Sequence, residues 1–120
     1  MKLAIVGSRT FLDYEVLQKT LLEHFQLSEI ESIISGGAIG TDTLAETFAH
    51  QHAIPMVVMK PDWARYGKRA GFLRNTQIIE AATHVIAFWD GASSGTKNSI
   101  ETAKRLKRPL IIWSQGKIQN

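Results

Sequence analysis

Two glycine-rich turns, each after a short apolar run, carry the residue types best suited to binding phosphate. The first glycine-rich turn covers residues 35–42 (SGGAIGTD), and the second glycine-rich turn covers residues 90–96 (DGASSGT). Each is predicted to lie between a strand and the start of a helix, where backbone N–H groups point outward and the helix dipole favours negative charge. Glycines there leave room for a ligand to touch the backbone. Two such turns in one small domain indicate a ligand that carries phosphate, such as a nucleotide.

Polar and charged side chains follow three predicted strands. After the first strand, Ser8 offers a hydroxyl and Arg9 offers a forked cation that suits phosphate oxygens. Lys97 lies in the first turn of a predicted helix, where a cation opposes the helix dipole and therefore favours a nearby anion. Trp89 ends a strand, where its indole would either stack on a base or pack in the core. The predicted nucleotide-binding residues are Gly7, Ser8, Arg9, Thr10, Gly36, Gly37, Ala38, Gly40, Thr41, Asp42, Trp63, Arg74, Asn75, Trp89, Asp90, Ser94, Gly95, Thr96 and Lys97.

Two of these features allow more than one interpretation. Asp42 stands at a predicted helix start, so its carboxylate would either cap the helix or hold a ribose hydroxyl. Residues 60–71 (KPDWARYGKRAG) mix basic and aromatic side chains and lead to Arg74 and Asn75. Such a segment would bind single-stranded nucleic acid, close over one nucleotide, or form a solvated connector with Trp63 against the core.

The elements that must position these residues follow from the apolar periodicity. Strands are predicted at residues 3–6, 32–34, 56–59, 84–89 and 110–113, with single helices between them. Asp13 is the predicted N-cap of the first helix, and Phe72, Ile78, Ile79 and Ala82 are predicted to face inward from the third. This alternation predicts an α/β class and one Rossmann-like, doubly wound domain over residues 1–120. Its parallel five-stranded sheet has the order 3-2-1-4-5, with helices on both faces and a frayed tail from residue 114. Ligands bind where the winding of such a sheet reverses, so the three turns are expected to converge.

The composition excludes several classes of site. The chain has 120 residues, a net charge of +3 and no cysteine, which excludes disulfides and thiolate metal sites and fits a cytoplasmic location. Neither a Gly-x-Gly-x-x-Gly fingerprint nor a Gly-Lys-Ser/Thr ending is present, so a dinucleotide cofactor in the standard pose and a P-loop are not expected. The histidines are scattered. We therefore expect no metal, no cofactor and no membrane span.

The motifs together resemble the SLOG superfamily, the Rossmann-like group that joins the Smf/DprA DNA-processing proteins with the Lonely Guy phosphoribohydrolases. The nearest resemblance is to its YspA/YpsA-related branch of small stand-alone domains. It rests on GSRTF at residues 7–11, the first glycine-rich turn, KPDW at 60–63, Arg74-Asn75, FWDG at 88–91 and SGT at 94–96. The resemblance implies binding of a nucleotide or a nucleotide-derived ligand, including one derived from NAD or ADP-ribose, by a sensor or sequestering module. It also implies a homo-oligomer.

Two alternatives come with the resemblance. In the Lonely Guy enzymes an Arg and a Glu cleave the N-glycosidic bond of a nucleoside monophosphate, and Arg74 is similar to that Arg. The Glu position is occupied by Ser99, which leaves Glu101 or Asp90 as substitute acids. A hydroxyl does not replace a carboxylate at an oxocarbenium-like centre, so the catalytic candidates are Arg74, Glu101 and Asp90 without a complete set. The second alternative is single-stranded DNA binding, as in the DNA-processing relatives.

Overall fold

The apolar runs of the chain form strands that pair in one sheet. The computed structural model describes residues 1–119 of the 120-residue chain. The strand order is β3-β2-β1-β4-β5-β6, and β1 to β5 are all parallel, which confirms the predicted class and the order of these five. The strands are β1 (Lys2–Gly7), β2 (Ser32–Ser35), β3 (Met56–Val58), β4 (His84–Trp89), β5 (Leu110–Ser114) and β6 (Lys117–Ile118).

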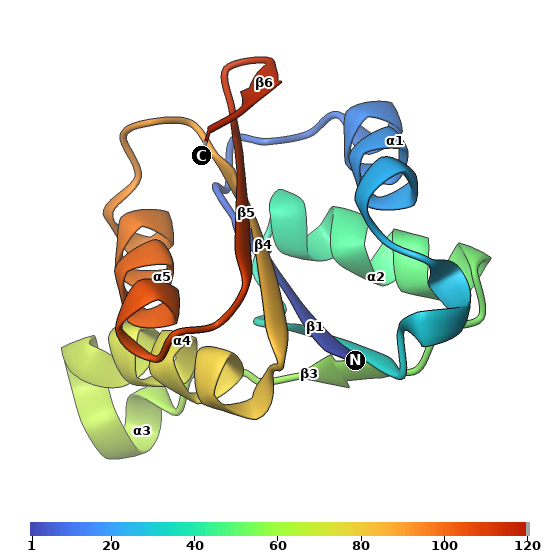
Figure 1. Ribbon diagram of the computed structural model, residues 1–120. Helices are drawn as coiled ribbons and strands as arrows, with labels where there is room; N and C mark the ends of the chain where they lie inside the picture. Colours follow the sequence, from blue (N-terminus) through green and yellow to red (C-terminus); the bar gives the residue numbers. More distant parts are fainter. Residues whose placement is uncertain (120) are drawn as a thin grey trace.

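Helices cover both faces of this sheet (Figure 1). Asp13 is the N-cap of α1, as predicted, because its side chain accepts a hydrogen bond from the amide of Val16. No helix within residues 1–119 combines the length and the apolar character that a membrane span requires. The helices are α1 (Tyr14–His24), α2 (Thr41–Gln51), α3 (Trp63–Tyr66), α4 (Ala70–Ala81) and α5 (Ser94–Arg105), with short 3-10 turns at η1 (Leu27–Glu29) and η2 (Gly67–Arg69).

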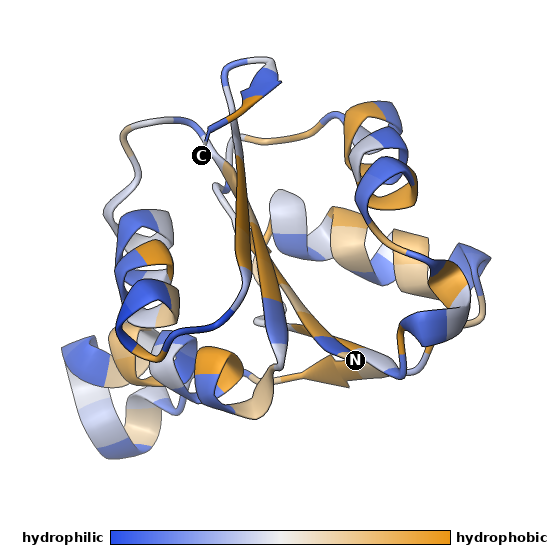
Figure 2. Cartoon of the chain, viewed as in Figure 1, coloured by the Kyte–Doolittle hydropathy of each residue, from blue (hydrophilic) through white to orange (hydrophobic). Residues whose placement is uncertain are grey.

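The core has two layers because successive strand residues point to opposite faces. Leu3 and Ile5 of β1 pack toward α1 and α2, together with Phe48 of α2. Ala4 and Val6 pack toward α4 and α5 on the other face. Figure 2 shows the hydrophobic strands enclosed between helices whose outer surfaces are largely hydrophilic. The result is a three-layer domain whose loops at one end of the sheet are free to form a site.

The C-terminal tail differs from the prediction. Residues from 114 onward were expected to be frayed, but Lys117–Ile118 form β6, which pairs antiparallel with the end of β5. Gln115 and Gly116 have φ values of 52° and 87°, and two central residues of positive φ are typical of the tight turn that joins antiparallel strands. The prediction of five strands was therefore wrong by one short strand. Its two residues are too few to show the alternation of apolar and polar residues that is typical of a strand.

The segment before α4 also differs from the prediction. Residues 60–71, for which no helix was predicted, contain α3 and η2, and the Asp62 side chain caps α3 by accepting the amide of Arg65 at 3.1 Å. Ile78, Ile79 and Ala82 are buried as predicted, but Phe72 is 50% exposed, so its predicted inward position was wrong. Phe72 instead lines the cavity described below.

The sheet order places the ends of β1 and β4 side by side. Gly7 is in register with Phe88, and the Ser8 amide donates to the Phe88 carbonyl at 2.9 Å. Beyond this pair the chain leaves β1 toward α1 and leaves β4 toward α5, which lie on opposite faces of the sheet (Figure 1). Loops that diverge in this way leave a crevice at the carboxyl ends of the strands.

Candidate functional site

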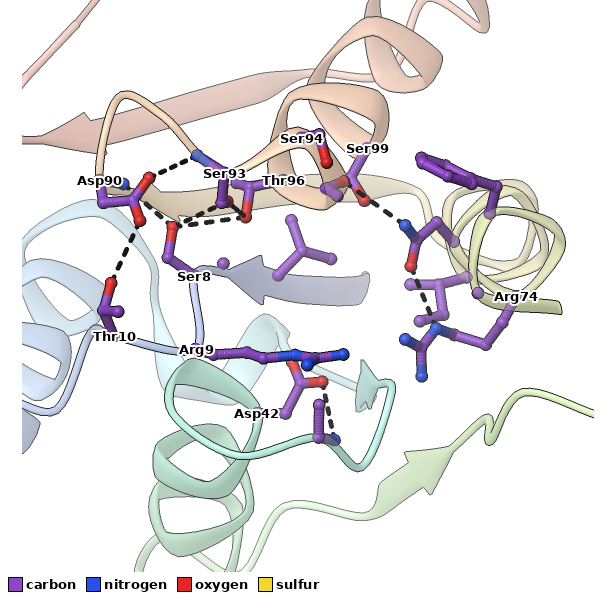
Figure 3. Close-up of a pocket in the computed structure, with 18 of the residues that line it drawn as sticks. Ser8, Arg9, Thr10, Asp42, Arg74, Asp90, Ser93, Ser94, Thr96 and Ser99 are labelled. Atoms are coloured by element: carbon purple, nitrogen blue, oxygen red, sulfur yellow. Dashed lines mark hydrogen bonds between the residues drawn. The ribbon is translucent and has the colours of Figure 1, made fainter. Parts of the chain in front are cut away.

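A cavity of about 460 Å³ occupies this crevice. Its walls come from the loop after β1, the first glycine-rich turn, the second glycine-rich turn with the start of α5, and the segment from α3 to α4 (Figure 3). The three turns thus surround one space. The predicted residues that line it are Gly7, Ser8, Arg9, Thr10, Ala38, Asp42, Trp63, Arg74, Asn75, Asp90, Ser94, Gly95 and Thr96, and the further lining residues are Val6, Lys68, Gly71, Phe72, Ile78, Ser93 and Ser99.

The second glycine-rich turn presents an open helix start to the cavity. The N-cap Ser93 makes no side-chain capping hydrogen bond, and its carbonyl accepts the amide of Lys97. The first amides of a helix have no partner within the helix, and no acceptor for those of Ser94, Gly95 and Thr96 is found in residues 1–119. These N–H groups and the α5 dipole favour a negatively charged oxygen at this wall.

Asp90 organises this turn rather than pointing a free carboxylate into the cavity. One carboxylate oxygen accepts the amides of Ala92 and Ser93 at 2.8 and 2.7 Å, and the other accepts the Thr10 hydroxyl at 3.1 Å. The hydrogen bonds from the Ser93 and Ala92 amides hold the pKa of Asp90 below its ordinary value. Asp90 is therefore ionised at neutral pH, and its hydrogen bonds hold the loop at the edge of the cavity.

Buried hydroxyls connect the end of β1 to the same turn. The Ser8 hydroxyl accepts the Asp90 amide at 3.0 Å and lies 3.1 Å from the Ser93 hydroxyl, which donates to Thr96 at 2.8 Å. Ser8 and Thr96 are both buried. This network fixes the start of α5 against β1 and keeps the open amides in place (Figure 3).

Arg74 enters from α4 and is held in place by backbone carbonyls. Its Nη1 donates to the carbonyl of Gly36 at 2.6 Å and to that of Met59 at 3.4 Å, while its Nε donates to Asn75 at 3.0 Å. Asn75 in turn donates to the Gly95 carbonyl at 3.4 Å, so it links α4 to the second glycine-rich turn. Within residues 1–119 the Nη2 group of Arg74 has no acceptor, and it remains available to a ligand in the cavity.

Arg9 approaches the same space from the loop after β1. Its side chain is exposed, and no hydrogen bond or ion pair engages it within the part of the chain that the structure describes. Figure 3 shows it reaching across the cavity toward Arg74. Burial lowers the pKa of Arg74, and the charge of Arg9 acts in the same direction while that of Asp42 opposes it. Two guanidinium groups therefore share one cavity, and an anion between them would relieve their repulsion.

The first glycine-rich turn contributes one carboxylate, from Asp42. Its Oδ2 accepts the amide of Ala38 at 3.1 Å, so it closes the turn rather than capping the helix end. Burial raises the pKa of Asp42, although hydrogen bonding from Ala38, Ser35 and Gly36 and the charge of Arg74 oppose this. The other predicted residues of the turn, Gly36, Gly37, Gly40 and Thr41, are not among the residues that line the cavity. The Thr41 hydroxyl donates to the Ser8 carbonyl at 2.9 Å and joins the turn to β1.

The aromatic wall of the cavity is built from α3 and α4. Trp63 is 56% exposed, and it lines the cavity together with Phe72 and Lys68. Trp89, by contrast, donates its indole N–H to the Ser93 carbonyl at 3.1 Å, packs against the core and does not line the cavity. The lining residues that were not predicted as ligand-binding are Val6, Lys68, Gly71, Phe72, Ile78, Ser93 and Ser99. Three of them lie in segments that the sequence singled out: Ser93 in the second glycine-rich turn, and Lys68 and Gly71 in residues 60–71.

The α5 residues predicted for ligand binding or catalysis lie on different faces. Lys97 and Glu101 are exposed, pair with each other at 4.0 Å and do not line the cavity. Ser99 is buried and lines it. At the position where the resemblance implies a catalytic glutamate, the chain thus has Ser99, which brings a hydroxyl to the cavity wall and no carboxylate. Within residues 1–119, no three His, Cys, Asp or Glu side chains are grouped so that they could hold a metal ion.

A solved structure shares this fold. DNA processing protein A from Helicobacter pylori, described for its single-stranded DNA binding mode, superimposes with a TM-score of 0.72 at 22% identity. The match covers 96% of this chain and 66% of that protein, so this chain spans about two thirds of its length.

Sequence comparison identifies the family. The Gene 61 protein of Mycobacterium phage D29 is 30% identical over 117 residues, which cover 92% of this chain and 94% of the phage protein. Residues 1–66 match the profile of the YspA, cpYpsA-related SLOG family. This part of the chain runs from β1 to α3 and includes the whole first glycine-rich turn. The predicted family resemblance is thus confirmed, and the chain belongs to the YspA, cpYpsA-related SLOG family.

Proposed function

We propose that this protein binds a nucleotide or a nucleotide-derived ligand, including one derived from NAD or ADP-ribose, as a sensor or sequestering module. One observation carries the proposal: two guanidinium groups and an open helix start face the same cavity. The cavity volume of about 460 Å³ is within the range of roughly 300–1,000 Å³ that is typical of small-molecule sites.

The walls suit the parts of a nucleotide. The amides at the start of α5 and the guanidinium of Arg9 would hold phosphate oxygens, and the free Nη2 of Arg74 would add a further donor. The exposed indole of Trp63 offers a face on which a base would stack. Hydrolysis by the Lonely Guy route is not favoured, because Ser99 lines the cavity where that route needs a carboxylate and Glu101 does not line it.

Replacing Arg9 tests the proposal directly. A ligand at 100 times its Kd should raise the free energy of unfolding by ~2.7 kcal/mol. Because a charge-assisted hydrogen bond contributes about 1.5–3 kcal/mol, Arg9→Ala should weaken binding by roughly 10- to 100-fold. At the same ligand concentration the stabilisation should then fall to about 0.4–1.4 kcal/mol. Thermal melts with a panel of nucleoside mono- and diphosphates, ADP-ribose and NAD would measure this.

The matched control for that experiment is Arg105→Ala. Arg105 is an exposed arginine in the last turn of α5 and does not line the cavity. Its replacement should leave the ligand-induced shift unchanged. Arg9 has no partner in residues 1–119 and its charge repels that of Arg74, so its replacement should leave the melting temperature without ligand unchanged or slightly raised. The proposal would be contradicted if no compound in the panel raised the melting temperature of the wild-type protein.

Single-stranded DNA binding is a second candidate, and the exposure of the aromatic wall favours it. Trp63 and Phe72 are 56% and 50% exposed beside the cation of Lys68, and aromatic and basic side chains together form stacking surfaces for single strands. The fold is shared with a protein described for its single-stranded DNA binding mode. If this candidate holds, oligo(dT) affinity should fall steeply with salt and drop by about 1–3 kcal/mol in Trp63→Ala, as fluorescence anisotropy would show.

A homo-oligomer and a cytoplasmic location, both expected from the sequence, stay predictions.

A further inference from the structure

The carboxylate of Asp42 is buried without an ion pair. The residue is 9% exposed and lines the cavity. No lysine, arginine or histidine nitrogen of residues 1–119 lies within 4.0 Å of it, and the Ala38 amide donates to Oδ2 alone. The Ser35 hydroxyl and the Gly36 amide also lie close enough to the carboxylate to lower its pKa, but no donor in the same part of the chain has hydrogen-bond geometry to Oδ1. Oδ1 is not among the fully buried polar atoms that lack a partner, so it opens onto the cavity, where a donor group of a ligand would be able to bind it.

Asp42 lies beside the anion-binding groups. A Cβ placed on Gly36 would be 2.5 Å from Nη1 of Arg74 and 3.0 Å from Oδ2 of Asp42. The guanidinium and the carboxylate therefore flank the same backbone position. If one group of a ligand binds the free Nη2 of Arg74, the adjacent atoms of the same ligand lie next to Asp42.

The chemistry of the cavity restricts what that donor is. A metal ion is not supported, because no cluster of three potential ligands exists within residues 1–119. A cationic ligand group would meet Arg9, Arg74 and Lys68 in the same cavity. Neutral hydroxyl groups remain, and a carboxylate is an acceptor that suits them. In a nucleotide, the hydroxyls next to the phosphate are those of the ribose.

We propose that Asp42 recognises the ribose hydroxyls of the ligand, so that the cavity selects ribonucleotides over 2′-deoxynucleotides. This inference rests on the proposed nucleotide binding and adds the sugar specificity. A site built to hydrogen-bond a hydroxyl rejects the analogue that lacks it, since the buried acceptor is then left unpaired. Loss of a hydrogen bond to a charged group predicts that each ribonucleotide that binds does so roughly 10- to 100-fold more tightly than its 2′-deoxy counterpart.

The test uses matched ligand pairs. The four ribonucleoside 5′-monophosphates and ADP are each compared with their 2′-deoxy forms by isothermal titration calorimetry, on the wild-type protein, Asp42→Asn and Glu101→Gln. The asparagine carbonyl retains an acceptor for the Ala38 amide, so the turn should persist, and thermal melts without ligand check this. Glu101→Gln removes one charge from an exposed position outside the cavity and should keep the wild-type ratio.

The expected result is a ratio of 10 or more in the wild type that falls below about three in Asp42→Asn, mainly through weaker ribonucleotide binding. Equal affinities for both sugars in the wild type would overturn the sugar specificity and leave nucleotide binding standing. Binding of none of these ligands would overturn both. The wild-type ratio alone decides the question if the asparagine variant does not fold.

Discussion

Gly40→Ala is expected to lower the free energy of unfolding by about 3–5 kcal/mol, a large part of the stability of a small domain. Gly40 has φ 78° and ψ −126°, a conformation that an alanine adopts only with strain. A Cβ there would also lie 2.6 Å from the carbonyl carbon and the Cα of Arg9, which are backbone atoms and cannot rotate away. Chemical denaturation followed by circular dichroism measures the loss.

Gly71→Ala is the control for that substitution. Gly71 is in the first turn of α4, and a Cβ on it would meet the Trp63 ring at 3.6 Å, an ordinary contact. Alanine is the better helix former, so this variant should be unchanged or more stable by up to ~1 kcal/mol. A Gly40→Ala protein as stable as Gly71→Ala would show that the Arg9 backbone is not held against the first glycine-rich turn.

Gly36→Ala should weaken nucleotide binding by at least roughly 10-fold with little effect on folding. The atoms that its Cβ would meet belong to the far end of Arg74, 2.5 Å away at Nη1 and 2.8 Å at Cζ, and a flexible side chain is able to move. Such a move breaks the hydrogen bond from Nη1 to the Gly36 carbonyl and takes the free Nη2 out of position. Titration calorimetry with the strongest-binding nucleotide measures the change.

A double-mutant cycle separates this cause from a general disturbance of the turn. If Gly36→Ala acts by displacing Arg74, it should cost nothing further in an Arg74→Ala background. Additive losses would instead mean that the alanine alters the turn or Asp42, whose Oδ2 would be 3.0 Å from the new Cβ.

The periodicity of the chain was sufficient for the sheet but not for its last strand. Apolar runs such as that of β4 were long enough to predict residues 84–89 as observed. The two residues of β6 carry no period, and only Gly116 signalled the turn before them. Phe72 was assigned to the core because an apolar residue on a helix is normally buried. In the fold it stands where α4 borders the cavity, and no neighbouring element covers it.

The site was predictable to the level of the turns and not of the side chains. The reversal of winding between β1 and β4 places the turns together whatever their sequence. Whether the Lys97 side chain points into the cavity or toward solvent, by contrast, depends on the residue at which α5 begins. With Ser94 as the first helical residue, Thr96 and Ser99 turn inward, while Lys97 and Glu101 turn outward. The bond from Arg74 to the Gly36 carbonyl joins residues 38 apart, and no local pattern predicts it.

The short strand β6 gives the sheet two unlike borders. It pairs with the end of β5, and the Gln119 amide extends this cover to the Ile112 carbonyl at 2.7 Å. On the opposite border β3 has no outer neighbour in residues 1–119, and its Val57 and Val58 are partly open to water. A further strand would therefore find a longer open border at β3 than at β6. Two copies that paired through β3 would leave outward borders at which the outermost strand, β6, has only two residues, too few to guide a long strand pairing.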